Sequence, residues 1–393
     1  MSFNFDQIVE RRGSGSAKWE YFAGDVLPMW VADMDFRSPE PVIRALHARV
    51  EHGMFGYSSH PARLAETICA RMASLYDWQV EPEQIVFVPS LVSAMNIVCR
   101  AIGEPGDSVL TLTPAYPPFL SSPPSHQRVT DTLELQQVPS GRTFSYKLDL
   151  GAFAGAIHER TRVLMLCNPH NPIGYEYTPT ELRGMAEICL EKNVVICSDE
   201  IHCDLLLGGT RHVPLASLGP EIADRTITLM SPSKTFNQPG LGCAVAIIAN
   251  PELRKQFQQA SYGIVPHVNA LGLAATQAAF SECEPWLQAL REYLTANRDL
   301  MVRFVSEQMP QLTATVPQAT YLGWLDCRAS DIPGSPFTFF LEQAKVGFSD
   351  GAAFGPGGQG FVRINFGCPR ALLVEGLERM RAALDSLDGP SDR

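Results

Sequence analysis

The hydrophobic positions of this chain follow two patterns that alternate along most of its length. Short, predominantly apolar runs predict strands that are buried on both faces, as in a parallel sheet covered by helices. Between these runs an apolar residue recurs at every third or fourth position, which predicts helices with one buried face. We therefore predict an α/β fold with a mainly parallel central sheet and helices on both faces. The predicted strands are residues 85–88, 108–112, 163–167, 194–197, 227–230 and 243–248.

The predicted helices are marked by their ends as well as by their spacing. Thr178-Pro-Thr-Glu181 has the form of a capping box with proline at the first helical position, and Asn193 ends the helix that follows. Pro285 indicates where one long connecting helix begins within the helical region 270–309. The other helices predicted before this region are residues 41–50, 61–76 and 91–102.

The last part of the chain changes character and predicts a second, smaller α+β domain. A glycine-rich run at 351–360 lacks a strand before it and a helix after it, so we interpret it as turns. The alternating run at 361–367 predicts a half-buried strand. The other elements expected here are strands at 314–316 and 322–325 and helices at 336–344 and 371–387.

Two regions fit neither pattern. Residues 1–38 predict an extended arm with a strand and no helix, and residues 121–150 predict a surface excursion with short strands. We group the arm with the small domain. The predicted domains are therefore residues 50–285 for the large one, and residues 1–49 and 286–393 for the small one.

Composition excludes several classes of protein. The chain has 393 residues and a formal net charge of −11 without a basic stripe, which argues against nucleic acid or an anionic membrane as a partner. No apolar run approaches the ~20 residues that a membrane-spanning helix needs. The ten cysteines are scattered without a Cys-x-x-Cys pair, which favours a reducing compartment. We see no secretory signal and predict a cytoplasmic protein without a metal site.

Several predicted strands end in polar residues that are suited to chemistry. Because ligands bind outside the carboxyl ends of the strands in open α/β sheets, we expect these residues on one rim. The junction of strand and helix at Ser90 presents free N–H groups and a positive dipole end, which together bind phosphate. This junction has neither a dinucleotide fingerprint nor a Walker loop. The rim residues are Ser90, Tyr116, residues 168–171, Asp199 and Lys234.

Lys234 follows the apolar run 227–230 after two serines and a proline. A lysine in this position is either solvated at the mouth of a loop or held in a pocket, where desolvation lowers its pKa and makes it nucleophilic. This stretch alone leaves both interpretations open. The shared rim is what favours the pocket.

Three motifs carry a resemblance to a known family: Asn168-Pro-His-Asn-Pro-Ile-Gly174, Ser198-Asp-Glu-Ile-His202 and Ser231-Pro-Ser-Lys234. In this order and at these separations they resemble the aspartate-aminotransferase-like, fold-type I enzymes that use pyridoxal 5'-phosphate (PLP), over nearly the whole chain. Two further stretches, Leu27-Pro-Met-Trp-Val-Ala-Asp-Met-Asp-Phe36 and Asp199-Glu-Ile-His-Cys-Asp204, resemble the cystathionine β-lyase or C–S lyase branch.

The resemblance implies roles for the rim residues. Lys234 resembles the lysine that binds the cofactor covalently and later acts as the base at Cα. Asp199 resembles the carboxylate that keeps the pyridine nitrogen protonated, so that the ring accepts electrons. A helix N-cap is the alternative for Asp199.

Three more residues resemble contacts to the cofactor ring. Asn171 resembles the donor to the phenolic oxygen. His202 stands where many aminotransferases have a tyrosine, although histidine is usual in the lyase branch; a buried structural histidine is the alternative. Tyr116 resembles the aromatic residue stacked on the ring, and a core or lid aromatic is the alternative.

The phosphate contacts follow in the same way. The resemblance implies backbone N–H donors at Leu91 and Val92 and hydroxyl donors at Ser231 and Ser233. The arginine that many aminotransferases carry eight residues after the lysine is replaced by Gly242. Phosphate binding is therefore expected to depend more on the helix N-terminus and the hydroxyls.

The resemblance also implies roles for two residues outside the cofactor ring and the phosphate donors named above. Arg363 resembles the arginine that holds the substrate α-carboxylate with two hydrogen bonds, for which a planar guanidinium is suited; a surface salt bridge is the alternative. Tyr57 resembles a tyrosine that reaches the phosphate of the neighbouring subunit, which implies a homodimer; a simple surface tyrosine is the alternative.

The predicted function is a PLP-dependent C–S β-lyase that cleaves cystathionine or related cysteine S-conjugates to a thiol, pyruvate and ammonia. A PLP-dependent aminotransferase is the nearest alternative, because it shares every step up to loss of the α-proton. A non-catalytic regulatory or binding protein on the same scaffold is the alternative from another class.

Overall fold

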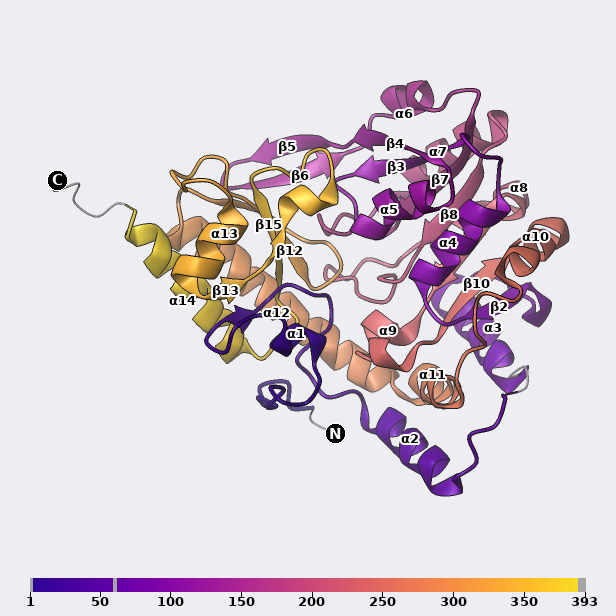
Figure 1. Cartoon of the computed structure of the whole chain (residues 1–393), viewed down its shortest axis with the longest axis horizontal. Coiled ribbons are helices and arrows are strands. Elements are labelled where there is room, and N and C mark those ends of the chain that lie inside the picture. The colour runs from indigo at the N-terminus through magenta and orange to yellow at the C-terminus, as the bar shows by residue number, and fades with distance from the viewer. Residues whose placement is uncertain (1–2, 59–61, 388–393) are drawn as a thin grey trace.

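The computed structural model of this chain describes residues 3–58 and 62–387 (Figure 1). Pro61, the predicted start of one helix, lies outside these ranges, and the helix is described from Ala62 to Tyr76 as α3. Two large sheets and one two-stranded sheet make up the β-structure of the described residues. No helix within the described ranges combines the length and the apolar character needed to cross a membrane.

The first sheet has seven strands in the order β2-β10-β9-β8-β7-β3-β4. All neighbouring pairs are parallel except those that involve β10, which is antiparallel to both β2 and β9. The predicted mainly parallel central sheet is therefore confirmed. The strands are β2 Ile85–Val88, β3 Ser108–Thr113, β4 Val129–Glu134, β7 Thr161–Cys167, β8 Val195–Asp199, β9 Thr226–Met230 and β10 Ala244–Ile248.

Helices cover both faces of this sheet because its central strands are apolar on both sides. In β7, Val163 and Met165 pack in one cluster with α4, α5 and α10, whereas Leu164 and Leu166 pack in another with α6, α7 and α8. Helix α7 starts with the predicted capping box, in which Thr178 and Glu181 bind each other's backbone N–H groups. The helices are α4 Leu91–Ala101, α5 Pro117–Ser125, α6 Leu150–Ala156, α7 Pro179–Glu191, α8 Pro220–Asp224 and α10 Pro251–Ser261.

The second sheet has six strands in the order β14-β15-β12-β11-β6-β5. The hairpin β5–β6 comes from the region that we expected to be a surface excursion, and β6 instead pairs in parallel with β11. Such a pairing joins residues far apart in sequence, so no local pattern predicts it. The strands are β5 Gln136–Ser140, β6 Thr143–Lys147, β11 Thr313–Thr315, β12 Leu322–Asp326, β14 Ser349–Asp350 and β15 Phe361–Asn365.

Helices α12 (Glu284–Gln308) and α14 (Arg370–Asp385) pack in the same core cluster as β12 and β15. Figure 1 shows α12 running from this second sheet toward α11 (Ala270–Glu282) and α2 (Glu40–His52). The helical region 270–309 is thus two helices, of which α12 is the predicted long one. The division into large and small domains stays a prediction.

The N-terminal arm corrects one expectation. It contains the short helix α1 (Ala17–Glu20), which Ser16 caps, where we predicted no helix. Its strand β1 (Leu27–Pro28) pairs with β13 (Val346–Gly347). The Lys18 amine, with an exposed fraction of only 1%, lies 2.7 Å from the Asp35 carboxylate and fixes the arm internally.

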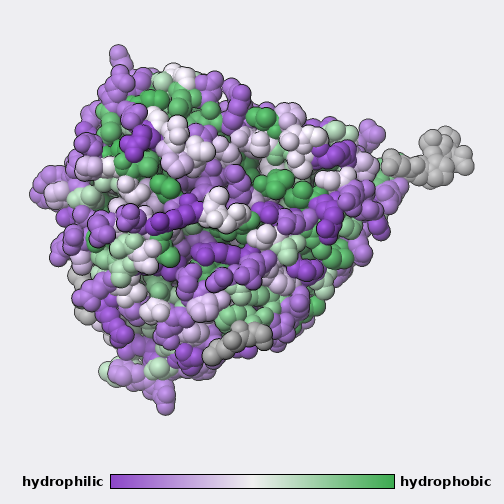
Figure 2. Space-filling view, turned by 180° about the vertical axis from the view of Figure 1, so that it is seen from behind, coloured by the Kyte–Doolittle hydropathy of each residue, from purple (hydrophilic) through white to green (hydrophobic). Residues whose placement is uncertain are grey.

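Strand β15 is a second correction, because all five of its residues are buried although alternation predicted a half-buried strand. Its polar residues are buried by partners rather than exposed to solvent. Asn365 donates to the carbonyl oxygens of Val31 and Asp33, both at 2.7 Å, and thereby binds the arm to the sheet. On the face opposite to that of Figure 1, hydrophilic side chains surround several small hydrophobic areas (Figure 2).

Candidate active site

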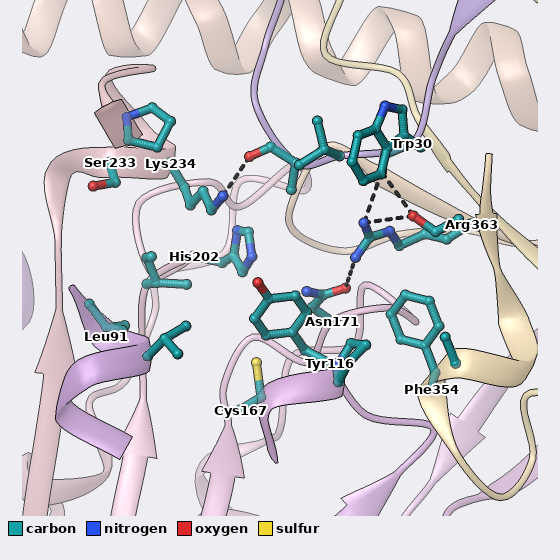
Figure 3. A pocket seen from close by; sticks show the side chains of 18 of the residues that line it. Trp30, Leu91, Tyr116, Cys167, Asn171, His202, Ser233, Lys234, Phe354 and Arg363 are labelled. Carbon is teal, nitrogen blue, oxygen red and sulfur yellow. Dashed lines mark hydrogen bonds between the residues drawn. The ribbon is translucent and has the colours of Figure 1, made fainter. Parts of the chain in front are cut away.

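A cavity of about 550 Å³ lies at the carboxyl ends of the parallel strands, closed on the other side by the arm and by β15 (Figure 3). Strands β2, β9, β8, β7 and β3 all end on this rim, because β10 alone runs in the opposite direction. The cavity brings together every predicted site residue except Tyr57. Those that line it are Leu91, Val92, Tyr116, Asn171, Asp199, His202, Ser231, Ser233, Lys234 and Arg363.

One end of the cavity is built for an anion. Ser90 caps α4 by accepting a hydrogen bond from Ser93 N at 3.1 Å. Leu91 and Val92 then occupy the first turn, whose N–H groups have no acceptor within the helix. Ser231 Oγ lies 2.8 Å from Ser233 Oγ and brings two hydroxyls to the same cavity. Because the Ser231 hydroxyl also donates to the carbonyl oxygen of Cys243 at 2.7 Å, this end offers backbone N–H groups and the Ser233 hydroxyl to a phosphate.

Gly242, in the place of the expected arginine, has a left-handed backbone with φ 56°. A Cβ atom there would lie 3.4 Å from the carbonyl oxygen of Pro89. A side chain at this position would be strained, which explains why glycine is suited to it. Among the described residues that line the cavity, Lys234 and Arg363 are the only basic side chains.

Asp199 ends β8 and is fully enclosed. Its Oδ1 accepts a hydrogen bond from Ile201 N at 3.0 Å, so it does cap the turn that follows. No described Lys or Arg forms an ion pair with it. Burial, reinforced by the adjacent Glu200, raises the pKa of Asp199 to about 7. The carboxylate therefore faces the cavity in need of a cationic partner.

The Lys234 amine lies deep in the cavity and donates a hydrogen bond to the carbonyl oxygen of Ala32 at 2.5 Å. Burial, and then repulsion by Arg363, lower the pKa of Lys234 to about 8, although Asp33 and Asp199 act in the opposite direction. The interpretation as a solvated lysine at a loop mouth is wrong. The side chain as a whole is partly exposed, but its amine lies inside the cavity, and the lowered pKa would suit it to nucleophilic attack.

His202 and Tyr116 lie between Lys234 and Asn171 in Figure 3. Burial, with the nearby Lys234 and Arg363, lowers the pKa of His202 to about 3, so this ring is neutral. Its buried Nδ1 has no hydrogen-bond partner among the described residues. Burial also raises the pKa of Tyr116, whose hydroxyl stays protonated.

Arg363 is 4% exposed, which rules out a surface salt bridge. Its guanidinium donates to Asn171 Oδ1 at 2.9 Å, to the Trp30 carbonyl oxygen at 2.9 Å and to Ser349 Oγ at 3.0 Å. It also lies 5.0 Å from the ring centroid of Phe354. Among the described residues its Nε has no partner, and burial lowers the pKa of Arg363 to about 10. A substrate anion would supply the missing acceptor.

Tyr57 is the predicted site residue that the structure leaves outside the cavity. It lies between α2 and α3 with an exposed fraction of 104%, so it makes no contact with the site of its own chain. Its predicted role at a neighbouring subunit stays a prediction, as do the ligand contacts of the other site residues.

Sequence reasoning missed the wall that the arm contributes. Trp30 and Ala32 give carbonyl oxygens to Arg363 and Lys234, and Tyr321 Oη donates to the same Ala32 oxygen at 2.9 Å. The stretch 27–36 could have indicated this wall, but it indicated to us only the branch of the family. Tyr321 carried no local signal at all.

This fold and site define the class to which the chain belongs. The family model of class I and II aminotransferases matches residues 26–380, and the chain belongs to this family. The chain is 37% identical over 389 residues to cystathionine beta-lyase PatB of Bacillus subtilis (strain 168), covering 97% of this chain and 100% of the relative.

Two solved structures have the same fold over nearly the whole chain. Cystalysin from Treponema denticola, which contains a PLP cofactor, has a TM-score of 0.94 and 30% identity, over 98% of this chain and 100% of that chain. OvoB has a TM-score of 0.92 and 43% identity over the same shares. The predicted fold class, the family and its C–S lyase branch are confirmed.

The cavity fits PLP in four respects. Asp199 would pair with the pyridine nitrogen, and His202, whose Nδ1 has no partner among the described residues, would add a polar group for the phenolic oxygen. The first turn of α4 would hold the phosphate. The Lys234 amine, with its lowered pKa, would bind the aldehyde. The family uses PLP, and these residues supply what the cofactor requires.

Proposed function

We propose that this protein is a PLP-dependent C–S β-lyase, which cleaves cystathionine or related cysteine S-conjugates to a thiol, pyruvate and ammonia. The observation that carries the proposal is that Lys234, Asp199 and Arg363 face one cavity and that none of them has an opposite charge as a direct partner among the described residues. Three ionisable groups that line one cavity without forming a direct ion pair are unfavourable for stability and are typical of a functional site.

Arg363 would bind the substrate α-carboxylate. Asn171, Ser349 and the Trp30 carbonyl fix the plane of the guanidinium, and its Nε remains available for a carboxylate oxygen. A fixed guanidinium of this kind orients the amino acid before any bond changes.

Lys234 would act as the base. Because its pKa is about 8, roughly a tenth of the amine is unprotonated at pH 7, far more than for an ordinary lysine, and this form can accept the α-proton. When bound, PLP would supply the electron sink for the pair of electrons that the α-proton leaves behind, and Asp199 would keep the ring nitrogen charged. The C–S bond then breaks and the electron pair leaves with sulfur as a thiolate. The remaining aminoacrylate reacts with water to give pyruvate and ammonia.

The aminotransferase alternative has the support of the family, whose members are described as class I and II aminotransferases. The two reactions share the loss of the α-proton and diverge afterwards. Elimination is favoured by the full-length relationship to a cystathionine β-lyase. A purely regulatory protein would not need Lys234, Asp199 and Arg363 gathered in one cavity.

Incubation of the purified PLP-loaded protein with L-cystathionine tests the function. We expect pyruvate and homocysteine in equal amounts, measured by lactate dehydrogenase coupling and by a thiol reagent. Conversion of the cofactor to its amine form without release of thiol would establish the aminotransferase instead. Absence of both would leave the regulatory alternative.

We also propose a homodimer in which Tyr57 of one copy lies near the phosphate site of the other. Tyr57 and its neighbours Met54 and Phe55 are exposed in the single chain, as residues of an unoccupied interface would be. Sedimentation at low concentration should give a dimer, and Tyr57→Phe should raise the Kd for PLP several-fold. A monomer with full cofactor affinity would refute the arrangement.

A cytoplasmic location completes the proposal. Within the described ranges all ten cysteines are free thiols, and all except Cys69 are buried. A chain that keeps so many thiols unpaired is suited to a reducing compartment.

A further inference from the structure

The part of the cavity next to Arg363 differs from the part that fits PLP. Figure 3 shows Trp30 and Phe354 beside Arg363, on the side away from Leu91 and Ser233. Aromatic rings from three separate segments form this part of the lining. We call it the aromatic wall, and it consists of Tyr21, Phe22, Trp30, Phe337, Phe348 and Phe354.

The arm contributes the outer half of the aromatic wall as one cluster. The ring centroids of Tyr21 and Trp30 are 4.6 Å apart, and those of Tyr21 and Phe22 are 4.9 Å apart. The Trp30 backbone holds Arg363, so the position of this cluster relative to the guanidinium is fixed. A substrate bound through its carboxylate at Arg363 would therefore have these rings within reach of its side chain.

The charges of the cavity are distributed unevenly. Among the described lining residues the acidic and basic groups are Lys234, Arg363, Asp199 and Asp350, since His202 is neutral. The first three are committed to the cofactor and the α-carboxylate. Asp350 is left, and its Oδ1 accepts only the backbone N–H of Ala352 at 3.1 Å. No described cation in the lining is available for a second carboxylate.

This distribution separates two kinds of substrate. The leaving part of cystathionine ends in an ammonium and a second carboxylate, and a carboxylate placed against apolar rings and Asp350 loses hydration without gaining a partner. An uncharged aromatic group loses little hydration and gains offset or edge-to-face contacts with Tyr21 and Trp30.

We propose that the aromatic wall is the side-chain subsite and that it selects cysteine S-conjugates whose leaving thiol bears an uncharged aromatic group. The inference rests on the proposed function and names its preferred substrate class. The bond changes are those of the proposed elimination, with the arylalkyl thiolate as the leaving group.

The test compares S-benzyl-L-cysteine, S-methyl-L-cysteine and L-cystathionine with the PLP-loaded protein, using pyruvate release. Each of them expels an alkyl thiolate, so leaving-group chemistry contributes little to the comparison. We expect kcat/KM for the benzyl conjugate to exceed that for cystathionine by about tenfold or more. Equal or higher values for cystathionine would overturn the inference and leave the function intact. No pyruvate from any of the three would refute the function itself.

Variants of the wall provide the second arm. Tyr21 is 68% exposed, so Tyr21→Ala leaves the core unchanged. It should lower the benzyl-to-methyl ratio of kcat/KM about tenfold. Asp350→Asn, which keeps the oxygen that accepts from Ala352, should raise the cystathionine-to-benzyl ratio. Tyr262→Ala, an exposed aromatic outside the cavity, is the matched control and should change neither ratio. A Tyr21→Ala ratio equal to that of the unchanged protein would contradict the subsite.

A binding measurement separates the subsite from catalysis. The thioether 3-(benzylthio)propanoate has the carboxylate and the benzyl group but no amine, so it cannot react. Calorimetry should show that it binds more tightly than glutarate, and Tyr21→Ala should remove most of the difference. Equal binding of the two compounds would contradict the subsite, whichever substrates the enzyme cleaves. Tighter binding of the benzyl compound without pyruvate release would support the subsite and refute only the proposed function.

Discussion

The Lys234 amine and the Ala32 carbonyl oxygen lie 2.5 Å apart, although 202 residues separate them in sequence. The same oxygen accepts a hydrogen bond from the Tyr321 hydroxyl at 2.9 Å. The arm thus fixes the position of the amine that we propose as the nucleophile and base.

Replacement of Lys234 by alanine should abolish both the visible absorbance of the PLP-loaded protein and pyruvate release. The reason is that no other described amine lines the cavity. Absorbance spectra after dialysis measure the outcome. Lys255→Ala, a change at an exposed position on α10, is the control and should retain both signals. Retained absorbance in Lys234→Ala would remove our central assignment.

Uptake of PLP by the cofactor-free protein should follow the titration of Lys234. An amine attacks an aldehyde only when it is unprotonated, so the rate should rise with pH. Because burial lowers the pKa of Lys234 to about 8, the rise should be centred near that pH. A short lysine peptide should show its midpoint at about 10.4. Stopped-flow absorbance measures both, and coincident midpoints would argue against a desolvated amine.

Arg363→Lys should raise KM for the amino-acid substrate about 100-fold, because charge-assisted hydrogen bonds contribute about 1.5–3 kcal/mol each. The shorter, single-point ammonium cannot keep the bonds to both Asn171 and Ser349. The absorbance of bound PLP should persist. Arg328→Lys, at an exposed position near the same sheet, should leave KM unchanged. A normal KM in Arg363→Lys would place the carboxylate elsewhere.

Glu200 and His212 should contribute to the stability of the fold together, so that losing one charge destabilises the protein more than losing both. Both side chains are inaccessible, and His212 Nε2 lies 2.9 Å from Glu200 Oε2. Burial opposes protonation of His212, but Glu176 and Glu200 outweigh it and raise the pKa of His212 to about 9. His212→Asn should lower the free energy of unfolding by about 3–5 kcal/mol, because it leaves a buried carboxylate without a cation.

The double variant with Glu200→Gln removes both charges and should recover most of this loss. Urea unfolding of the two single variants and the double variant measures the cycle. If the double variant is no more stable than His212→Asn alone, the pair acts through packing and our electrostatic explanation is wrong.

Local patterns predicted the parts of the site that belong to single strand ends. Asp199 is the last residue of β8, and Asn171 and Lys234 each lie four residues past the end of an apolar strand, so the apolar runs and the parallel sheet suffice to place them on one rim. Arg363 required more, because alternation marked its strand as half-buried. Its burial depends on Asn171, Trp30 and Ser349, which no short window contains.

Contacts between distant segments could not be predicted from the sequence. The pairing of β6 with β11 joins Phe144 to Thr315, and no pattern within either strand identifies the partner. Tyr57 shows the converse limit, since the role that we propose for it in another copy would leave no trace in the contacts of its own chain.

The anchoring of the arm determines when, during synthesis, the chain can complete its cavity. Trp30 and Val31 emerge early from the ribosome, but the side chains that bind their carbonyls, Arg363 and Asn365, emerge near the end. A nascent chain that already contains Lys234 and Asp199 still lacks β15, which forms one wall of the cavity. The complete cavity therefore forms only at the end of synthesis. Fragments that end before β15 should not react with free amino acids.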